Sequence, residues 1–134
     1  MSLDETTDDA AGGRYAYEGL DRVLHEKARL GILTCLASRP QGLLFNDLKE
    51  LCSLTDGNLS RHLQLLNQNG LIEIWKGFEK RKPQTLCRLS AEGKERYLAY
   101  LSELEKVLQD AQASTQKSFN DSRLQSLPPG WAPA

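Results

Sequence analysis

The stretch from Leu54 to Leu71, LTDGNLSRHLQLLNQNGL, constrains the fold of this 134-residue chain more than any other part of the sequence. Thr55 is a good N-cap residue, because its hydroxyl can accept a hydrogen bond from a free amide of the first helical turn. The pair Asn69-Gly70 supplies the left-handed residue that ends many helices. Together these signals predict one short helix over residues 55–69.

This helix has two unlike faces. Leu59, Leu63 and Leu66 are spaced four and three apart, so they share one face. The residues expected on the outer face or its flanks are Gly57, Asn58, Ser60, Arg61 and Gln64. A guanidinium among amides and hydroxyls can pair with base edges and phosphates in a DNA major groove. A solvated surface helix would show the same pattern, so the flanking segments decide between the two interpretations.

The segment before this helix predicts a second, shorter one. Residues 43–45 are apolar and fit a very short strand, and Asn46 can cap a helix with the sequence DLKELC. Leu48 and Leu51 are expected to face inward. Ser53-Leu54 then forms the turn between the helices. Two short helices joined by a tight turn are typical of a helix-turn-helix.

After Gly70 the apolar period changes from 3.6 to 2, which predicts strands over residues 71–76 and 85–89. The expected hairpin tip, residues 77–84, carries Lys80, Arg81 and Lys82 in succession. A charge run on a loop is usually just solvated. Directly after a helix-turn-helix, however, it fits a wing that lies along the DNA backbone or enters the minor groove.

Longer helices are expected at both ends of the domain. From Tyr15 to about Ser38 the pattern is apolar on more than one face, which predicts a helix buried against its own domain and against a partner. The last helix follows its cap, Ser90, and carries a heptad seam. The seam could pack within its own domain, but its length favours a dimer contact. The interface residues predicted on these two helices are Leu20, Val23, Leu24, Tyr97, Leu101, Leu104 and Leu108.

Composition limits the alternatives. The net charge is −1, but the first thirteen residues are acidic, so the remainder is weakly positive, which permits nucleic-acid binding without requiring it. No apolar run approaches the ~20 residues of a membrane helix. The three cysteines show no CxxC pair and no zinc spacing, which favours buried thiols in a reducing compartment such as the cytoplasm. We expect one domain over residues 14–117, between a disordered acidic segment, 1–13, and an irregular proline-rich tail, 118–134.

Two segments carry a family resemblance. GNLSRHLQLLNQNGLI resembles the recognition-helix segment of small bacterial and archaeal regulators of the MarR, ArsR and PadR type. KRKPQTLCRLSAEGKERY resembles their wing and the "leucine-threonine-x-x-glycine" entry to the dimer helix, with Ser90 in place of threonine and Gly93 as the glycine. The resemblance covers about Leu20 to Leu108. It implies a winged helix-turn-helix, mainly α with a small β-hairpin (α+β), with long N- and C-terminal dimerisation helices.

The resemblance also implies a function. Such regulators bind double-stranded DNA sequence-specifically as homodimers, here at a pseudo-palindromic operator. Thr55 and the outer face of residues 55–69 would then enter the major groove. ArsR-type metal sensors carry a cysteine pair on the helix before the recognition helix, where this chain has only Cys52, so no metal site is supported. Glu79 and Arg81 loosely match the acidic residue and arginine of MarR-type wings.

Other functions find less support. No catalytic motif accompanies the two histidines, His25 and His62, so we predict no enzyme, no catalytic residues and no cofactor. His62 is expected to pack against the core rather than reach a phosphate. The sequence shows no small-molecule effector site. The main rival is a winged helix that binds protein rather than DNA, which the cations around the outer face and wing disfavour.

Overall fold

The structure is a computed structural model that describes residues 13–120 and 127–134. The acidic segment 1–13 therefore lies almost wholly outside the described residues, as does part of the tail 118–134. The chain forms two compact units, one from Glu18 to Leu101 and the other from Met1–Tyr17 with Ser102–Ala134. Among the described residues, no helix combines the length and the apolar character needed to cross a bilayer.

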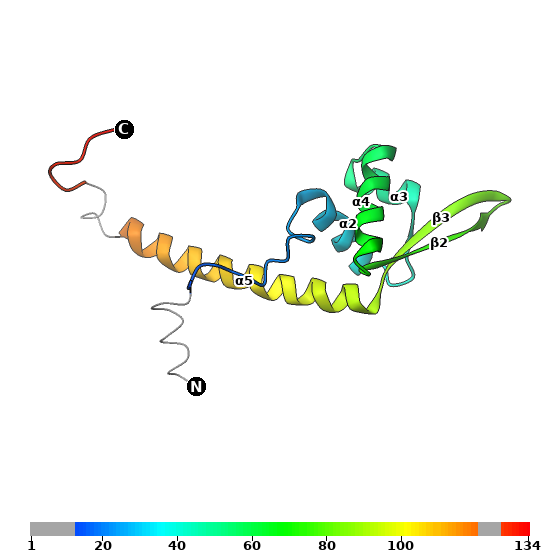
Figure 1. The fold of residues 1–134 in the computed structure, drawn as a ribbon, viewed down its shortest axis with the longest axis horizontal. Coiled ribbons are helices and arrows are strands. Elements are labelled where there is room, and N and C mark those ends of the chain that lie inside the picture. The colour runs from blue at the N-terminus through cyan, green and yellow to red at the C-terminus, as the bar shows by residue number, and fades with distance from the viewer. Residues whose placement is uncertain (1–12, 121–126) are drawn as a thin grey trace. The chain divides into compact units, whose positions relative to one another are not determined.

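The elements follow the order expected for a winged helix-turn-helix (Figure 1). They are α2 (Lys27–Ala37), β1 (Leu43–Leu44), α3 (Phe45–Cys52), α4 (Asp56–Gln68), β2 (Ile72–Glu79), β3 (Lys82–Leu89) and α5 (Ala91–Asn120). Helices with one small antiparallel sheet confirm the α+β class. The long C-terminal helix is also confirmed, and it ends three residues beyond the predicted domain boundary at 117.

The core of the unit Glu18–Leu101 is aliphatic, apart from Cys87, Tyr97 and Tyr100. The residues that are at most 1% exposed are Leu24, Ile32, Leu33, Leu36, Leu48, Leu59, Leu66, Leu71, Cys87 and Tyr100. Leu59, Leu63 and Leu66 of α4 are all buried, as their spacing predicts. Burying one leucine contributes about 1.5–3 kcal/mol, so this face is the main apolar attachment of α4 to the rest of the unit.

The sheet has the order β1-β3-β2, with both pairings antiparallel. Leu43 pairs with Cys87, which confirms the short strand. In the hairpin, Ile72 pairs with Leu89 and Glu79 pairs with Lys82. The strands are therefore longer than predicted, and most of the expected tip 77–84 is strand. Only two residues remain for the turn.

The N-terminal helix is much shorter than predicted. It begins at Lys27 with Glu26 as its cap, and residues 14–25 form turns and bends instead. Asp21 explains the difference, because its Oδ1 accepts a hydrogen bond from the Val23 amide at 2.8 Å and so competes with helical bonding. Arg96 of α5 donates to Oδ2 of the same carboxylate at 2.5 Å. Burial raises the pKa of Asp21, but these hydrogen bonds outweigh it and the pKa lies below its ordinary value.

Two predictions for α3 are also wrong. Asn46 does not cap it, because the helix begins at Phe45, two residues earlier than predicted and directly after β1, with Leu44 in the cap position and no side-chain cap. This start turns Leu48 into the core but leaves Leu51 60% exposed.

The second unit is held by a polar cluster on α5. Arg14 donates from both terminal nitrogens to the Asp110 carboxylate, each at 3.0 Å, and the Tyr17 hydroxyl donates to the same carboxylate at 2.6 Å. These hydrogen bonds hold the pKa of Asp110 below its usual range, and the bond to Asp110 raises the pKa of Tyr17 to about 12. The segment before α2 is therefore tied to α5 by charge and hydrogen bonds.

A close contact joins the start of α5 to the turn after α4. The Ser90 hydroxyl donates to the Gly70 carbonyl at 2.6 Å and accepts from the Gly93 amide at 2.9 Å, so Ser90 caps α5 as predicted. The Ser90 amide donates to the Leu71 carbonyl at 3.0 Å. A Cβ on Gly93 would lie 1.9 Å from that same carbonyl oxygen. Glycine is therefore required here by the approach of backbone to backbone.

We expect Gly93→Ala to destabilise the domain by about 1–3 kcal/mol, because α5 must shift away from Leu71 and lose the hydrogen bonds at Ser90. Gly31→Ala in α2 is the matched control. A Cβ on Gly31 meets nothing within 4 Å, so that variant should be more stable by about 0.5–1 kcal/mol. Urea unfolding followed by circular dichroism measures both, and equal midpoints for the two variants would contradict this account.

Candidate nucleic-acid interface

The outer face of α4 is exposed as the sequence predicts. Gly57, Asn58, Ser60, Arg61 and Gln64 are all exposed, and none belongs to the core. The Thr55 hydroxyl accepts a hydrogen bond from the Asn58 amide at 3.2 Å, which confirms the N-cap. Arg61 Nη2 in turn donates to Asn58 Oδ1 at 3.0 Å. The cap therefore leads into an ordered polar pair on the exposed face.

The turn between α3 and α4 is tightly fixed. Ser53 ends α3 in a left-handed conformation, with φ of 52°. Lys49 Nζ of α3 lies 2.9 Å from Asp56 Oδ1 in the first turn of α4. An acidic residue at a helix N-terminus also interacts favourably with the helix dipole. The left-handed turn at Ser53 therefore leads directly from α3 into α4, and the partly exposed Lys49–Asp56 ion pair adds a small contribution.

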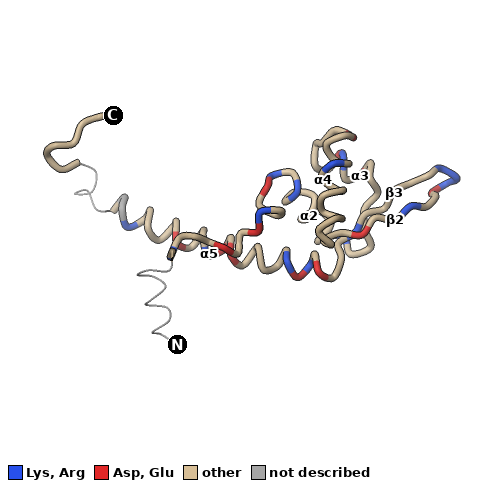
Figure 2. The backbone as a smooth tube through the Cα atoms, in the orientation of Figure 1, with Lys and Arg blue, Asp and Glu red and all other residues tan. Residues whose placement is uncertain are grey.

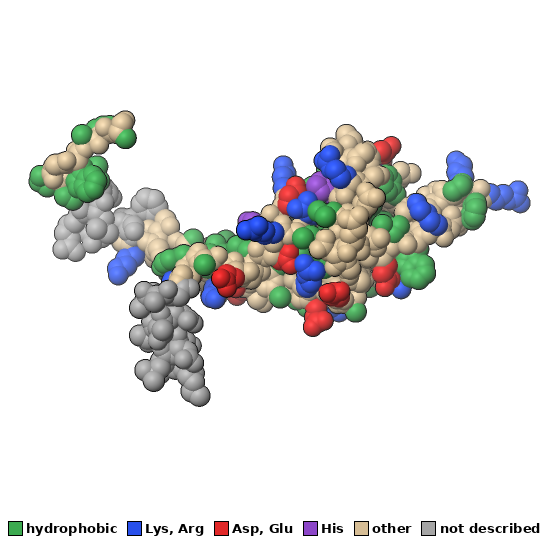
Figure 3. Space-filling view, in the orientation of Figure 1, with side chains coloured by type: hydrophobic (Ala, Val, Ile, Leu, Met, Phe, Trp, Pro, Cys, Tyr) green, Lys and Arg blue, Asp and Glu red, His purple; other side chains and the backbone are tan. Residues whose placement is uncertain are grey.

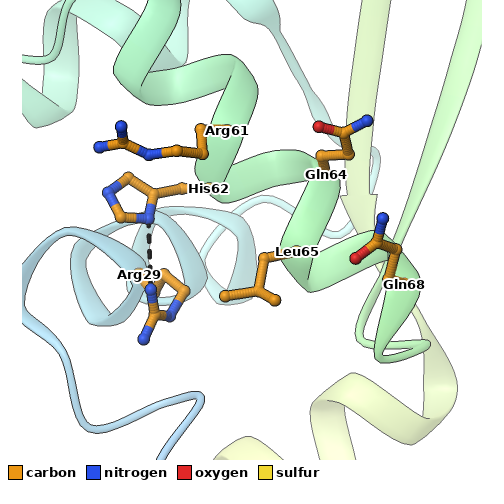
Figure 4. A pocket seen from close by; sticks show the side chains of 6 residues that line it. All are labelled: Arg29, Arg61, His62, Gln64, Leu65 and Gln68. Atoms are coloured by element: carbon orange, nitrogen blue, oxygen red, sulfur yellow. Dashed lines mark hydrogen bonds between the residues drawn. The ribbon is translucent and has the colours of Figure 1, made fainter.

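A hollow of about 260 Å³ opens beside α4 (Figure 4). It is lined by Arg29, Arg61, His62, Gln64, Leu65 and Gln68. Arg29 comes from α2, and its Nε donates to the Val23 carbonyl at 2.5 Å. Its Nη1 lies 3.4 Å from His62 Nδ1. Because a guanidinium only donates, Nδ1 is the acceptor, and a neutral His62 carries its proton on Nε2.

Sequence reasoning missed Arg29, because only the fold brings α2 beside α4. His62 is half-buried, as the packing prediction requires, but it also contacts Arg29. Two guanidinium groups and an imidazole thus line one hollow beside α4. Such a group of donors suits the oxygens of a phosphate.

The wing ends in a strained cationic turn. Lys80 and Arg81 both have positive φ, 51° and 67°. Two central residues of this kind mark a type I′ hairpin turn, in which Asn-Gly is preferred. Lys80, Arg81 and Lys82 are exposed, and none of them forms a salt bridge within the described part of the chain. Figures 2 and 3 show these cations gathered at the end of the β2–β3 hairpin.

Below its tip, the wing contains one ion pair and one further cation. Arg88 Nε lies 2.6 Å from Glu73 Oε1, and its guanidinium stands 5.4 Å from the centre of the Trp75 ring. The hydrogen bond from Arg88 holds the pKa of Glu73 below its ordinary value. Lys76 Nζ donates to the Thr85 hydroxyl at 2.9 Å. Lys76 keeps its positive charge, so the hairpin carries one cation on β2 and three successive cations at its tip.

The hairpin also exposes apolar groups that we did not predict as part of the site. Phe78 is 78% exposed and Trp75 is 51% exposed. Phe78 pairs with Pro83 across the hairpin, one step below the turn. The sequence places Phe78 in the expected hairpin tip, and only the structure shows that it is an exposed residue of β2.

The predicted dimer residues fall into two groups. Leu24 and Tyr97 are 0% and 7% exposed, and the Tyr97 hydroxyl is 2.9 Å from that of Thr34, so both pack within their own unit. The others keep exposed surface: Leu20, Val23, Leu101 and Leu104 are half-buried and Leu108 is 52% exposed. Leu98, which we did not predict, is 53% exposed.

The side chains that commonly bind metal ions are scattered. Within residues 13–120 and 127–134 there is no group of three or more histidine, cysteine, aspartate or glutamate side chains that could hold a metal ion.

Residues 28–108, more than half of the chain, match the family described as the winged helix DNA-binding domain. The chain therefore belongs to that family, which is one of DNA-binding domains and not of enzymes.

Relatives agree with this assignment. A transcriptional regulator homologue from Pyrococcus horikoshii OT3 has 31% identity and a TM-score of 0.64, over 68% of this chain and 89% of that one. An uncharacterized protein of Methanocaldococcus jannaschii is 37% identical over 60 residues. Those residues are 45% of this chain, and they span only 65% of that relative's length.

A more distant structure shares the fold. MepR of Staphylococcus aureus, solved as a MepR–DNA complex, has 19% identity and a TM-score of 0.61, over 92% of this chain and 99% of that one. The protein is thus a winged-helix DNA-binding domain of the kind found in transcriptional regulators.

Proposed function

We propose that this protein regulates transcription by binding a pseudo-palindromic DNA site as a homodimer, with α4 in the major groove and the wing on the backbone or in the minor groove. One observation carries the proposal. Within the unit Glu18–Leu101, an exposed polar helix face and an unpaired cationic hairpin tip belong to the same domain. A nucleic acid offers base edges to the polar helix face and phosphates to the cationic hairpin tip.

The side chains on α4 have separate roles. Asn58, Ser60, Arg61 and Gln64 read bases, with Arg61 the group able to grip guanine through two hydrogen bonds. Gly57 lets the DNA backbone approach the helix. Thr55 and the first-turn amides hold a phosphate. Arg29 and His62 bind a second phosphate, because the hollow that they line lies at the edge of the same helix.

A dimer follows from the size of the site. One recognition helix reads about four or five base pairs, which is too few for specificity in a genome. Two helices related by a two-fold axis reach successive major grooves about 34 Å apart. The contact would use Leu101, Leu104 and Leu108 of α5, with Leu20 and Val23 as a second surface. Leu24 and Tyr97 are left out, because their own unit already buries them.

A protein-binding winged helix is the second candidate, and the exposed Phe78 and Trp75 favour it. A binding assay on random-sequence duplex at low salt separates the two functions. DNA binding through phosphates falls steeply as salt rises, whereas a domain that binds only protein shows no such association.

Replacing Lys80, Arg81 and Lys82 with alanine should weaken binding to any duplex. The slope of log affinity against log salt should flatten by up to ~0.9 for each phosphate that the wing no longer neutralises. A second variant, Lys80→Asn with Arg81→Gly, removes two charges while supplying the preferred type I′ turn, so it separates charge from hairpin folding. Lys117→Ala, which removes a cation from the last turn of α5, serves as control. An unchanged slope in both wing variants would mean that the wing does not touch DNA.

Arg61→Ala should cost more on a selected operator than on random DNA. The difference should be ~1–3 kcal/mol for the base that Arg61 reads. Lys94→Ala, which removes an exposed cation from α5, is the control. Operators can be selected from a random pool and both affinities measured by fluorescence anisotropy. Equal losses on the two DNAs would reduce Arg61 to a phosphate contact.

Leu101→Glu with Leu108→Glu should give a monomer that keeps its helix content but loses operator binding. Each carboxylate would be buried without a partner in the dimer, at a cost of several kcal/mol. Ser102→Glu with Gln109→Glu adds the same charge at exposed neighbouring positions and should remain dimeric. Light scattering measures the state of each variant. A wild-type monomer at tens of micromolar, or a dimeric Leu101/Leu108 variant, would refute this interface.

A further inference from the structure

Two cysteines that lie far apart in the sequence meet inside the helix-turn-helix. Cys35 is on α2 and Cys52 is the last residue of α3, and their sulfur atoms are 3.9 Å apart. Both side chains are half-buried, and both thiols are free. Cys87, on β3, is fully buried and also free.

We propose that Cys35 and Cys52 form an intrachain disulfide when the protein meets a low-molecular-weight disulfide, and that the closed form binds DNA more weakly. The first half concerns the thiols alone. The second half rests on the proposed function.

The geometry favours closure. A disulfide requires a sulfur–sulfur distance of ~2.05 Å, so the two atoms must approach by roughly 2 Å. The third cysteine is not a competitor, because it is buried in the sheet, where Cys87 pairs with Leu43 and Ile74. Three cysteines allow three disulfide pairings, and the fold therefore favours the one between Cys35 and Cys52.

Two successive thiol–disulfide exchanges would close the bond. One protein thiol loses its proton, and the resulting thiolate attacks a sulfur of the small disulfide, breaking its S–S bond and releasing one small thiolate. The second protein thiolate attacks the protein sulfur of this mixed disulfide and releases the other small thiolate. The protein gives up two electrons and two protons, and the small disulfide becomes two thiols.

The reaction is slow at neutral pH. Burial, together with the nearby Cys35, raises the pKa of Cys52 to about 11, so few molecules carry that thiolate at any moment. The pair is therefore suited to a lasting shift in the surrounding thiol–disulfide balance rather than to a brief pulse of oxidant.

Closure would act on the recognition helix through a short path. Cys52 is followed by Ser53, the left-handed residue of the turn, and then by Leu54, whose amide donates to the Lys49 carbonyl at 3.1 Å. Thr55, the cap of α4, comes next. Drawing Cys52 toward α2 thus displaces the residue that enters this turn, and α4 changes its angle to the wing. Simultaneous contact of α4 and wing with one duplex then becomes less favourable.

The test incubates the full-length reduced protein with oxidised glutathione under native conditions. Intact mass should fall by two hydrogen atoms, and peptide mapping should place the link between residues 35 and 52. Affinity for a random duplex at low salt should fall by ~5- to 150-fold, the usual range of coupling between two sites. Dithiothreitol should restore it.

Single serine variants supply the controls. Cys87→Ser should behave like the wild type. Cys35→Ser and Cys52→Ser should form no intrachain link, so any glutathione stays attached as a mixed disulfide, and their mass shows this directly. Urea unfolding should confirm that each variant is folded before oxidation.

The outcomes separate the two parts. If the folded wild type forms no link between residues 35 and 52, the pair is refuted. If the link forms but the affinity stays the same, the regulatory half is refuted. If the reduced protein binds no duplex at all, the proposed function fails, while the mapped link still decides whether the pair closes.

Discussion

The burial of one leucine face fixes the position of everything else in the unit Glu18–Leu101. Leu59, Leu63 and Leu66 are at most 3% exposed, and their burial offsets part of the entropy lost when α4 is ordered. Rotating α4 by one residue would move these side chains about 100° and expose them. The same constraint determines which side chains are left outside. When the leucine face is buried, the opposite face of α4 must point outward, and Asn58 and Arg61 lie on that face. The candidate interface is therefore a direct consequence of the core.

A second constraint couples α4 to the wing and to α5. The turn after α4 ends at Gly70, with φ of 73°, and the Gly70 and Leu71 carbonyls both accept hydrogen bonds from Ser90. Gly93 lets the first turn of α5 press against Leu71. Recognition helix, hairpin and long helix therefore meet within a few residues, and a shift in one is transmitted to the others through backbone contacts rather than through flexible side chains.

The features that depend only on neighbouring residues can be predicted from the sequence. The cap at Thr55, the end of α4 at Gly70 and the leucine face all depend on residues within one or two turns, and all three predictions are confirmed. Apolar periodicity predicts a first helix that begins too early. It cannot reveal that Asp21 accepts a hydrogen bond from the Val23 amide, nor that Arg96, 75 residues away, donates to the same carboxylate. The predicted strands of the hairpin are too short, because Lys80 and Arg81 are poor residues for a type I′ turn and the sequence therefore gives no signal for one.

The candidate site shows the same division. The exposed face of α4 could be predicted from spacing, but Arg29 and the meeting of Cys35 with Cys52 could not, since each depends on how α2 packs against its neighbours. Leu24 and Tyr97, which the sequence predicts as interface residues, show the opposite error. An apolar stripe in the sequence does not reveal whether its own domain or a partner covers it, and here the domain covers both.

The charge arrangement of the wing is best understood as a compromise between folding and binding. Left-handed backbone costs a residue with a side chain about 1 kcal/mol or more, and this turn uses two such residues in succession. At the base of the same hairpin, Arg88 is paired with Glu73 and stacked near Trp75. A hairpin selected for stability alone would place Asn-Gly at the turn, yet this one places bare cations there. Strain kept at a tip that has no structural use for it is common at functional sites, and the three cations there fit the proposed contact of the wing with phosphates.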